Sequence, residues 1–265
     1  MLNYLFLALA IVATVLVYVF IPTVSPWLIL PILLGGFVAA ILLYVVFLLV
    51  WSFFLPKRKP IKRTKPICAR MIYLTMDWLM SLLRIRVKLT GTELLPDEPC
   101  ILVSNHQSDF DPMAVLAVWK GRRVAFISKE ANFKIPIVGN FIHHAGFLAI
   151  DRGNGMRALR TLKQAAEMQK AEGLDIGIYP EGTRSKTGEL LRFKSGAFLL
   201  AKRAEAPIVV MSTNGTGRIS KNFLIRRTDV ELRILAVIDR QTVIETEREE
   251  LTERVREIIE KDLKK

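Results

Sequence analysis

A short polar stretch at residues 104–111 contains the residue types that acid–base catalysis requires. It reads S-N-H-Q-S-D-F-D and directly follows an apolar run. In a loop that joins a strand to a helix, the chain can fold back so that a carboxylate oxygen of Asp111 meets the imidazole of His106. The carboxylate then accepts a hydrogen bond from Nδ1–H and leaves Nε2 free to take a proton from a hydroxyl group. We therefore predict that His106 and Asp111 form a general-base pair.

Asp111 and Ser108 of this stretch also have simple structural roles. Asp111 is followed by Pro112 and an apolar helical pattern, which is typical of a helix with Asp as its N-cap and Pro at its first position. We expect Asp111 to serve as this cap as well. Ser108 is a poor candidate for a covalent nucleophile, because the chain has no G-x-S-x-G elbow. A hydrogen bond within the loop is the better interpretation.

A second stretch, P-E-G-T-R at residues 180–184, combines a tight turn with groups that bind anions. Gly182 permits close approach of a backbone, and the guanidinium of Arg184 can bind a phosphate through paired N–H groups. A surface ion pair between Glu181 and Arg184 is the alternative, and it would contribute little to stability. A P-loop is excluded, because Thr183 and Arg184 occupy the places where that motif has Lys followed by Ser or Thr.

A third stretch, D-R-G-N-G at residues 151–155, lies between a strand-like run and a helical pattern. Its glycines imitate a dinucleotide-binding fingerprint, but Asp151 and Arg152 intervene and no ribose-binding acid follows at a strand end. Arg152 beside a helix N-terminus is nevertheless a good anion site. Lys129 and the turn at residues 135–139 either form a groove wall or pack as loops. We interpret His143 and His144 as structural residues.

The first 56 residues contain no charged side chain, and all 38 basic and 25 acidic residues follow Pro56. Apolar runs at residues 2–21 and 27–55 are each long enough to cross a hydrocarbon core of about 30 Å. We predict a membrane hairpin at residues 1–56 that either crosses the bilayer or dips into a single leaflet. The spacing of Cys68 and Cys100 does not suit metal ligation and fits a reducing compartment.

A basic strip at residues 57–65 follows the hairpin. The positive-inside tendency places it, and everything after it, on the cytoplasmic side. It can also hold the chain against anionic lipid headgroups. Nucleic acid is not an expected partner, because the positive charge lies beside a membrane anchor and no base-stacking motif accompanies it.

Hydrophobic patterning predicts an amphipathic linker helix at residues 66–85, so that the strip and this helix occupy residues 57–85. Residues 86–265 are expected to form an α/β domain with a central mixed sheet flanked by helices. Strand-like runs occur at residues 86–89, 100–103, 124–127, 147–150, 175–179, 208–211 and 230–237. Helical patterns occur at residues 112–119, 155–171, 196–204 and 246–265.

Taken together, these stretches resemble the glycerolipid acyltransferase family, in particular its 1-acylglycerol-3-phosphate acyltransferases, over residues 85–240. His106 and Asp111 match its H-x-x-x-x-D block in a form close to N-H-Q-S-x-x-D. Residues 179–185 match F-P-E-G-T-R-S, with Tyr179 in place of Phe. The remaining matches are Lys129, Ile135-Pro136, Gly139, Gly146, Ile150-Asp151-Arg152, Phe193 to Phe198 and Ala206 to Val210.

The resemblance implies a fold like that of glycerol-3-phosphate acyltransferase and an acyl transfer to the sn-2 hydroxyl of lysophosphatidic acid, which gives phosphatidic acid. His106 would be the general base and Asp111 would orient it. The acceptor's glycerol phosphate would be held by Arg152, Glu181, Gly182, Thr183 and Arg184, with help from Lys194. The donor would be acyl-CoA or acyl carrier protein, without a metal or other cofactor. The implied location is the cytoplasmic face of a cell membrane, in particular a bacterial inner membrane.

Other acceptors fit the same chemistry, namely another lysophospholipid, a lyso-aminolipid or glycerol 3-phosphate. A non-catalytic lipid-binding protein on the same fold is an alternative from a different class. The intact pair of His106 and Asp111 favours the enzyme. The hairpin is longer and more apolar than the anchors of many bacterial members, which leaves its topology open.

Overall fold

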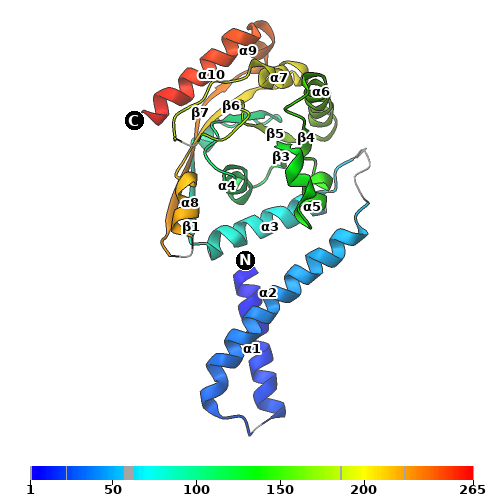
Figure 1. Cartoon of the computed structure of the whole chain (residues 1–265), viewed down its shortest axis with the longest axis vertical. Helices are drawn as coiled ribbons and strands as arrows, with labels where there is room; N and C mark the ends of the chain where they lie inside the picture. The colour runs from blue at the N-terminus through cyan, green and yellow to red at the C-terminus, as the bar shows by residue number, and fades with distance from the viewer. Residues whose placement is uncertain (1, 22, 57–62, 186, 224, 265) are drawn as a thin grey trace. The chain divides into compact units, whose positions relative to one another are not determined.

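The chain divides into two compact units, residues 1–59 and 60–265. The computed structural model describes residues 2–21, 23–56, 63–185, 187–223 and 225–264 (Figure 1). Most of the predicted basic strip therefore falls on residues 57–62, outside the described residues. Each unit has its own internal packing and is considered by itself.

The first unit is a pair of helices, α1 (Leu2–Phe20) and α2 (Ile29–Phe54). They pack closely where Gly36 faces Ala10, since a Cβ atom on Gly36 would lie 3.2 Å from the Ala10 Cα. Phe6 adds ring contacts with Phe37 and Tyr44, at centroid distances of 6.3 and 5.6 Å. This confirms the predicted hydrophobic helical hairpin.

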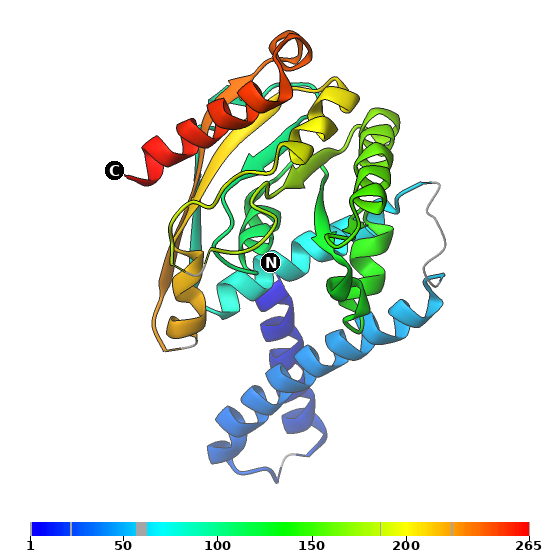
Figure 2. The same ribbon diagram turned by 45° about the horizontal axis from the view of Figure 1, so that its top comes forward.

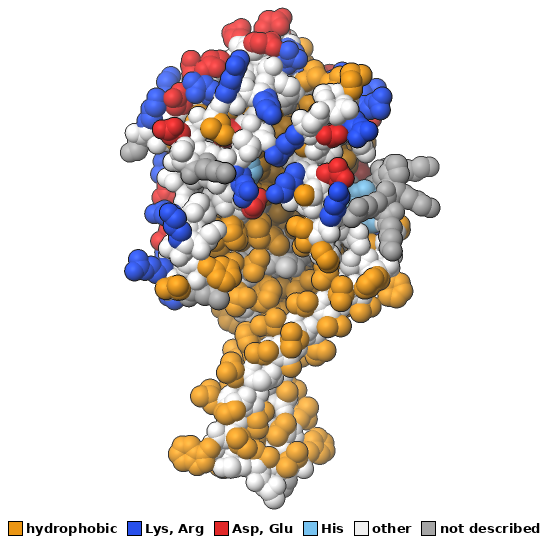
Figure 3. All heavy atoms as spheres, in the orientation of Figure 1, with side chains coloured by type: hydrophobic (Ala, Val, Ile, Leu, Met, Phe, Trp, Pro, Cys, Tyr) orange, Lys and Arg blue, Asp and Glu red, His pale blue; other side chains and the backbone are white. Residues whose placement is uncertain are grey.

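On the face shown in Figure 3, hydrophobic side chains cover the helical pair, and most large hydrophobic side chains of α1 and α2 are exposed. An 18-residue window has a mean hydropathy of 2.3 within α1 and of 2.9 within the segment from Pro26 to Phe54. By length and composition, both segments can cross a membrane. These two apolar helices indicate association with a membrane.

The second unit is built on a seven-stranded sheet in the order β1-β7-β6-β2-β5-β3-β4. All neighbouring strands are parallel except β6 and β7, which are antiparallel. The predicted mixed α/β sheet is therefore confirmed. The strands are β1 (Ile85–Thr90), β2 (Ile101–Ser104), β3 (Val124–Lys129), β4 (Leu148–Ile150), β5 (Asp175–Ile178), β6 (Ile208–Asn214) and β7 (Thr228–Ile238).

Helices cover both faces of the sheet (Figures 1 and 2). Strands buried on both faces read as continuous apolar runs rather than as alternating patterns, and β2 and β5 are buried along their whole length. One face carries α3 (Pro66–Leu82), α4 (Asp111–Val118) and α5 (Val138–His144); the other carries α6 (Gly155–Glu172), α7 (Phe198–Ala204) and α10 (Arg248–Leu263).

Three short helices were not predicted from the sequence. They are α5, α8 (Ile219–Asn222) and α9 (Arg240–Glu245). Helix α5 has only seven residues and begins just after Pro136, so the sequence pattern at its start is typical of a turn. Helices this short present too little of an apolar stripe for periodicity to reveal them.

Because β2, β3, β4, β5 and β6 run in the same direction, their carboxyl ends lie at a single edge of the sheet. The polar stretches that the sequence singles out follow β2, β4 and β5, so all of them reach this edge. Ligands of open α/β sheets bind outside the carboxyl ends of the strands. The topology therefore gathers the candidate site residues at one place.

A buried ionic network lies at the opposite edge, where β5 begins. Asp175 is only 1% exposed. Its Oδ2 accepts hydrogen bonds from Arg122 Nε at 2.8 Å and Trp119 Nε1 at 2.9 Å, while Oδ1 accepts one from the Cys100 N–H at 3.0 Å. Burial, reinforced by the charge of Asp175, raises the pKa of the Cys100 thiol well above its usual value. This carboxylate joins the starts of β2 and β5.

Replacing Asp175 by Ala should lower the free energy of unfolding by about 3–5 kcal/mol, because it leaves Arg122 without its buried partner. Urea denaturation of the full chain in detergent, followed by circular dichroism, measures this loss. Glu253→Gln is the matched control, since Glu253 pairs with Arg256 on the surface and should change stability by less than about 1 kcal/mol. Equal effects of the two variants would contradict the prediction.

Candidate active site

The side chains of His106 and Asp111 meet at the carboxyl end of β2. The Asp111 carboxylate is fully buried, and its Oδ2 lies 2.7 Å from Nδ1 of His106. The same oxygen accepts hydrogen bonds from the N–H groups of Gln107 at 2.7 Å and Ser108 at 2.9 Å. The side chain of His106 remains 12% exposed. The predicted contact between these two side chains is therefore present.

The predicted helix cap is wrong. Helix α4 begins at Asp111 itself, Phe110 occupies the N-cap position, and Pro112 is the second helical residue. The Asp111 carboxylate turns back to the loop instead of toward the helix N–H groups. The loop offers an imidazole and two backbone N–H groups to one oxygen, and together these satisfy the charge better than the helix terminus does.

A residue that the sequence did not reveal holds the second oxygen of Asp111. Thr216, in the loop after β6, is buried and donates its hydroxyl hydrogen to Oδ1. The same region is fixed by Asn105, which exchanges hydrogen bonds of 2.9 and 2.8 Å with the backbone of Thr213. Nothing in the sequence shows that β2 and β6 are neighbours, so Thr216 could not be paired with Asp111 in advance.

An aromatic stack supports the other face of His106. The His106 ring stacks on Tyr179 at a centroid distance of 4.3 Å, and Tyr179 stacks on Phe126 at 5.7 Å. Phe126 pairs with Gly177 across β3 and β5. A Cβ atom on Gly177 would lie 2.2 Å from the Phe126 ring, so only glycine leaves room for this ring. The absence of a side chain at Gly177 thus sets the position of the stack.

The hydroxyl group of Tyr179 is buried. Burial, with a smaller effect from the charge of Asp111, raises the pKa of Tyr179 well above its usual value. Among the described residues it has no hydrogen-bond partner. The phenol is therefore neutral, and its ring contributes through stacking.

Glu181 is 3% exposed, and its carboxylate is directed at backbone groups. Oε1 accepts a hydrogen bond from the N–H of His106 at 2.6 Å, and Oε2 accepts one from the N–H of Leu191 at 3.2 Å. Burial raises the pKa of Glu181. A further bond of 2.8 Å runs from the N–H of Ser185 to the carbonyl of His106. The sequence placed Glu181 among the acceptor-binding residues, whereas its contacts in the structure hold the His106 backbone.

The remaining residues of the P-E-G-T-R turn lie at its surface. Gly182 has a φ angle of +70°, and a Cβ atom there would lie 2.9 Å from Nζ of Lys194, so the lysine side chain crosses this glycine. Thr183 and Arg184 are exposed. Arg184 Nη1 lies 2.5 Å from Oδ2 of Asp109, also on the surface. The guanidinium thus lies beside the loop that carries His106.

Arg152 follows β4 and precedes α6, in an exposed position. Partial desolvation lowers the pKa of its guanidinium. Within the described part of the chain, neither Arg152 nor Lys194 forms an ion pair. Since adjacent strands are about 4.8 Å apart, β4 lies about 10 Å from β5. Arg152, Arg184 and Lys194 therefore make this side of the edge cationic.

These residues can combine proton abstraction with the binding of an anion. The imidazole of His106 is oriented at Nδ1, and the cations lie on the β5 side of it. No group of three or more His, Cys, Asp or Glu side chains within the described residues is placed to hold a metal ion. An anionic substrate with a hydroxyl group fits this arrangement.

Comparison with known proteins links this geometry to lipid acyltransferases. The chain is 38% identical over 136 residues to the chloroplastic 1-acyl-sn-glycerol-3-phosphate acyltransferase BAT2 of Brassica napus, covering 51% of this chain and 39% of that protein. It is 32% identical over 195 residues to the 1-acyl-sn-glycerol-3-phosphate acyltransferase of Saccharomyces cerevisiae, covering 72% and 63%. The chain thus spans less than two thirds of the length of either relative.

A solved structure is similar over most of both chains. It is the 1-acyl-sn-glycerophosphate (LPA) acyltransferase PlsC from Thermotoga maritima, with a TM-score of 0.64 and 28% sequence identity over 84% of this chain and 88% of that one. The model of the family described as "Acyltransferase" matches residues 86–214, which contain the H-x-x-x-x-D pair and the P-E-G-T-R turn. The chain is thus similar in sequence and in fold to acyltransferases, and the matched region contains both polar stretches of the candidate site.

Proposed function

We propose that the chain transfers a fatty acyl group from an acyl thioester to the sn-2 hydroxyl of 1-acylglycerol 3-phosphate, forming phosphatidic acid. The contact of 2.7 Å between His106 and Asp111, beside a cationic edge, carries this proposal. It is supported by the names of the plant and yeast relatives and of the Thermotoga structure, each of which denotes an acyltransferase of a 1-acylglycerol phosphate.

In the proposed mechanism, the Asp111 carboxylate accepts the hydrogen bond from Nδ1–H of His106 and so exposes the lone pair of Nε2. Nε2 takes the hydroxyl proton while the acceptor oxygen bonds to the thioester carbonyl carbon. The tetrahedral intermediate then expels the thiolate, which takes the proton from the imidazolium. General-base catalysis of this kind contributes about 10²- to 10⁴-fold to the rate.

The acceptor's phosphate binds on the β5 side of His106. Arg152, Arg184 and Lys194 supply positive charge there, and an Arg side chain can bind a phosphate with two parallel N–H groups. Thr183 supplies a neutral hydroxyl donor, and Gly182, whose N–H donates to the Tyr179 carbonyl at 3.1 Å, keeps the turn tight beside it. Glu181 is not assigned a contact with the acceptor; it fixes the backbone of His106.

The N-terminal helical pair holds the enzyme at the membrane where its lipid acceptor and product reside. We place the catalytic unit on the cytoplasmic face, because the segment that follows the hairpin is strongly basic. We infer the inner membrane of a bacterium, with which the bacterial source of the similar Thermotoga structure is consistent.

The proposal is tested by substituting the two reacting residues. His106→Ala should lower kcat by at least about 100-fold, and Asp111→Asn by a comparable factor, because the amide no longer fixes the imidazole tautomer. The assay follows radiolabelled acyl-CoA and a panel containing lysophosphatidic acid, other lysophospholipids, a lyso-aminolipid and glycerol 3-phosphate. His143→Ala is the control histidine. Full activity of His106→Ala, or no transfer to lysophosphatidic acid, would sink the proposal.

Removal of the cationic groups should weaken binding of the acceptor. Arg152→Ala and Arg184→Ala are each expected to raise the KM for lysophosphatidic acid about 10-fold or more, because a charge-assisted contact with phosphate is lost. Monoacylglycerol, which lacks the phosphate, should show no such change. Arg203→Ala, an exposed arginine in α7, serves as the control. An unchanged KM in both site variants would contradict the assigned phosphate site.

The aromatic stack should affect turnover rather than binding of the substrates. Tyr179→Phe keeps the ring and should retain kcat, while removal of its buried, unpaired hydroxyl stabilises the fold by about 1–3 kcal/mol. Tyr179→Leu and Gly177→Ala, which remove or displace the stack, should lower kcat and alter the pH profile with little change in KM. Steady-state kinetics from pH 5 to pH 9 make the comparison. A loss of kcat in Tyr179→Phe equal to that in Tyr179→Leu would contradict a role through stacking.

A further inference from the structure

A concave site lies beside the loop that carries the reacting pair. It is a pocket of about 440 Å³, within the range of roughly 300–1,000 Å³ that small-molecule sites occupy. None of the acceptor-binding residues assigned above contributes to it. Its lining residues are Gln107, Gly188, Asn214, Gly215, Gly217, Arg218 and Leu263.

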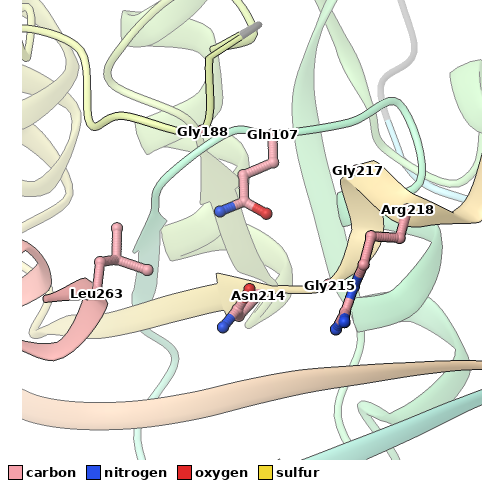
Figure 4. Close-up of a pocket in the computed structure, with 7 residues that line it drawn as sticks. All are labelled: Gln107, Gly188, Asn214, Gly215, Gly217, Arg218 and Leu263. Atoms are coloured by element: carbon pink, nitrogen blue, oxygen red, sulfur yellow. The ribbon is translucent and has the colours of Figure 1, made fainter. Parts of the chain in front are cut away.

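The lining combines amide groups with one cation. In Figure 4 the side-chain amides of Gln107 and Asn214 face each other across the pocket, and Arg218 comes from the same segment as Asn214. Within the described part of the chain, these amides have no hydrogen-bond partner. Each amide can both donate and accept hydrogen bonds. The pocket thus suits a ligand that itself carries amides and an anionic group.

Arg218 is available to bind that anion. Its Nη2 has one long hydrogen bond of 3.4 Å, to the carbonyl of Asp229, and among the described residues it pairs with no carboxylate. The side chain is exposed. A guanidinium in this state can bind a phosphate without first breaking an ion pair.

The pocket wall is tied directly to the carboxylate that orients the base. Gln107 donates its backbone N–H to Oδ2 of Asp111 at 2.7 Å. Thr216, between the lining residues Gly215 and Gly217, donates to Oδ1. A ligand in the pocket therefore contacts the two segments that hold Asp111.

The sheet order places the pocket on the other side of β2 from the residues assigned to the acceptor. β2 carries His106 and lies between β5 and β6. The cations assigned to the acceptor follow β4 and β5, whereas the pocket is lined by the segment after β6. In direct acyl transfer, both substrates must be bound beside Nε2 at the same time. The acceptor occupies the β5 side, so the β6 side is left for the donor.

We propose that this pocket binds the 4′-phosphopantetheine arm of the acyl donor. This inference rests on the proposed function and deepens it. The arm has two amide groups for Gln107 and Asn214, a phosphate for Arg218, and a terminal thioester that reaches His106. Coenzyme A and acyl carrier protein share this arm, so the pocket recognises the chemistry common to both carriers.

Binding measured without turnover tests the inference. In the full-length His106→Ala chain in detergent, isothermal titration calorimetry should show that 4′-phosphopantetheine and CoA bind about 10-fold or more tightly than pantetheine. Adding Arg218→Ala should abolish this preference, because one charge-assisted hydrogen bond is lost. Arg226→Ala, an exposed arginine outside the pocket, is the matched control and should retain it. Unchanged binding of 4′-phosphopantetheine in the Arg218 variant would overturn the inference.

Kinetics of the otherwise wild-type chain separate the two carriers. Arg218→Ala should raise the KM for acyl-CoA and acyl-4′-phosphopantetheine by similar factors of about 10 or more, and leave the KM for lysophosphatidic acid unchanged. Comparison of kcat/KM for acyl-CoA and acyl carrier protein shows which carrier the enzyme prefers. An effect confined to acyl-CoA would assign Arg218 to the nucleotide and overturn the inference. Absence of transfer by the wild-type chain would instead refute the proposed function, while the calorimetry would still decide the pocket.

Discussion

The fully buried carboxylate of Asp111 is the constraint on which the site depends. A buried carboxylate is tolerated only where donors surround it, and here three donors approach Oδ2 and one approaches Oδ1. The donors come from the loop after β2 and, through Thr216, from the loop after β6. Satisfying one charge therefore brings together segments separated by 105 residues. The same contact orients the imidazole, so stability and chemistry share one interaction.

Other contacts fix His106 in the remaining directions. Glu181 holds its backbone N–H, Ser185 holds its carbonyl, and Tyr179 lies against its ring. Each of these residues belongs to the stretch that follows β5. The residues of the P-E-G-T-R turn thus have two different roles. Glu181 turns inward and positions the base, whereas Thr183 and Arg184 turn outward to the surface.

The sequence predicted correctly those features that depend on residues close together in the chain. The five-residue separation of His106 and Asp111 predicted their contact, and apolar runs predicted the sheet. It failed where the answer depends on which strands are neighbours. Thr216 meets Asp111 only because β6 lies beside β2, and Gly177 matters only because Phe126 lies opposite it. The predicted cap at Asp111 was wrong for a related reason. The loop and Thr216 offer hydrogen-bond donors to its carboxylate, and these replace the N–H groups of the helix terminus.

The position of β2 between the two halves of the sheet edge has an evolutionary consequence. On the proposed assignment, the segments after β4 and β5 bind the head group of the lipid acceptor. The segment after β6 binds the carrier of the fatty acid. Exchanges at the exposed residues of one set leave the other set untouched, as long as Thr216 and Glu181, which hold Asp111 and His106, are retained. A lineage can therefore acquire a new lipid acceptor while keeping its supply of activated fatty acid. Diversification of membrane lipids then requires changes in only a few surface turns.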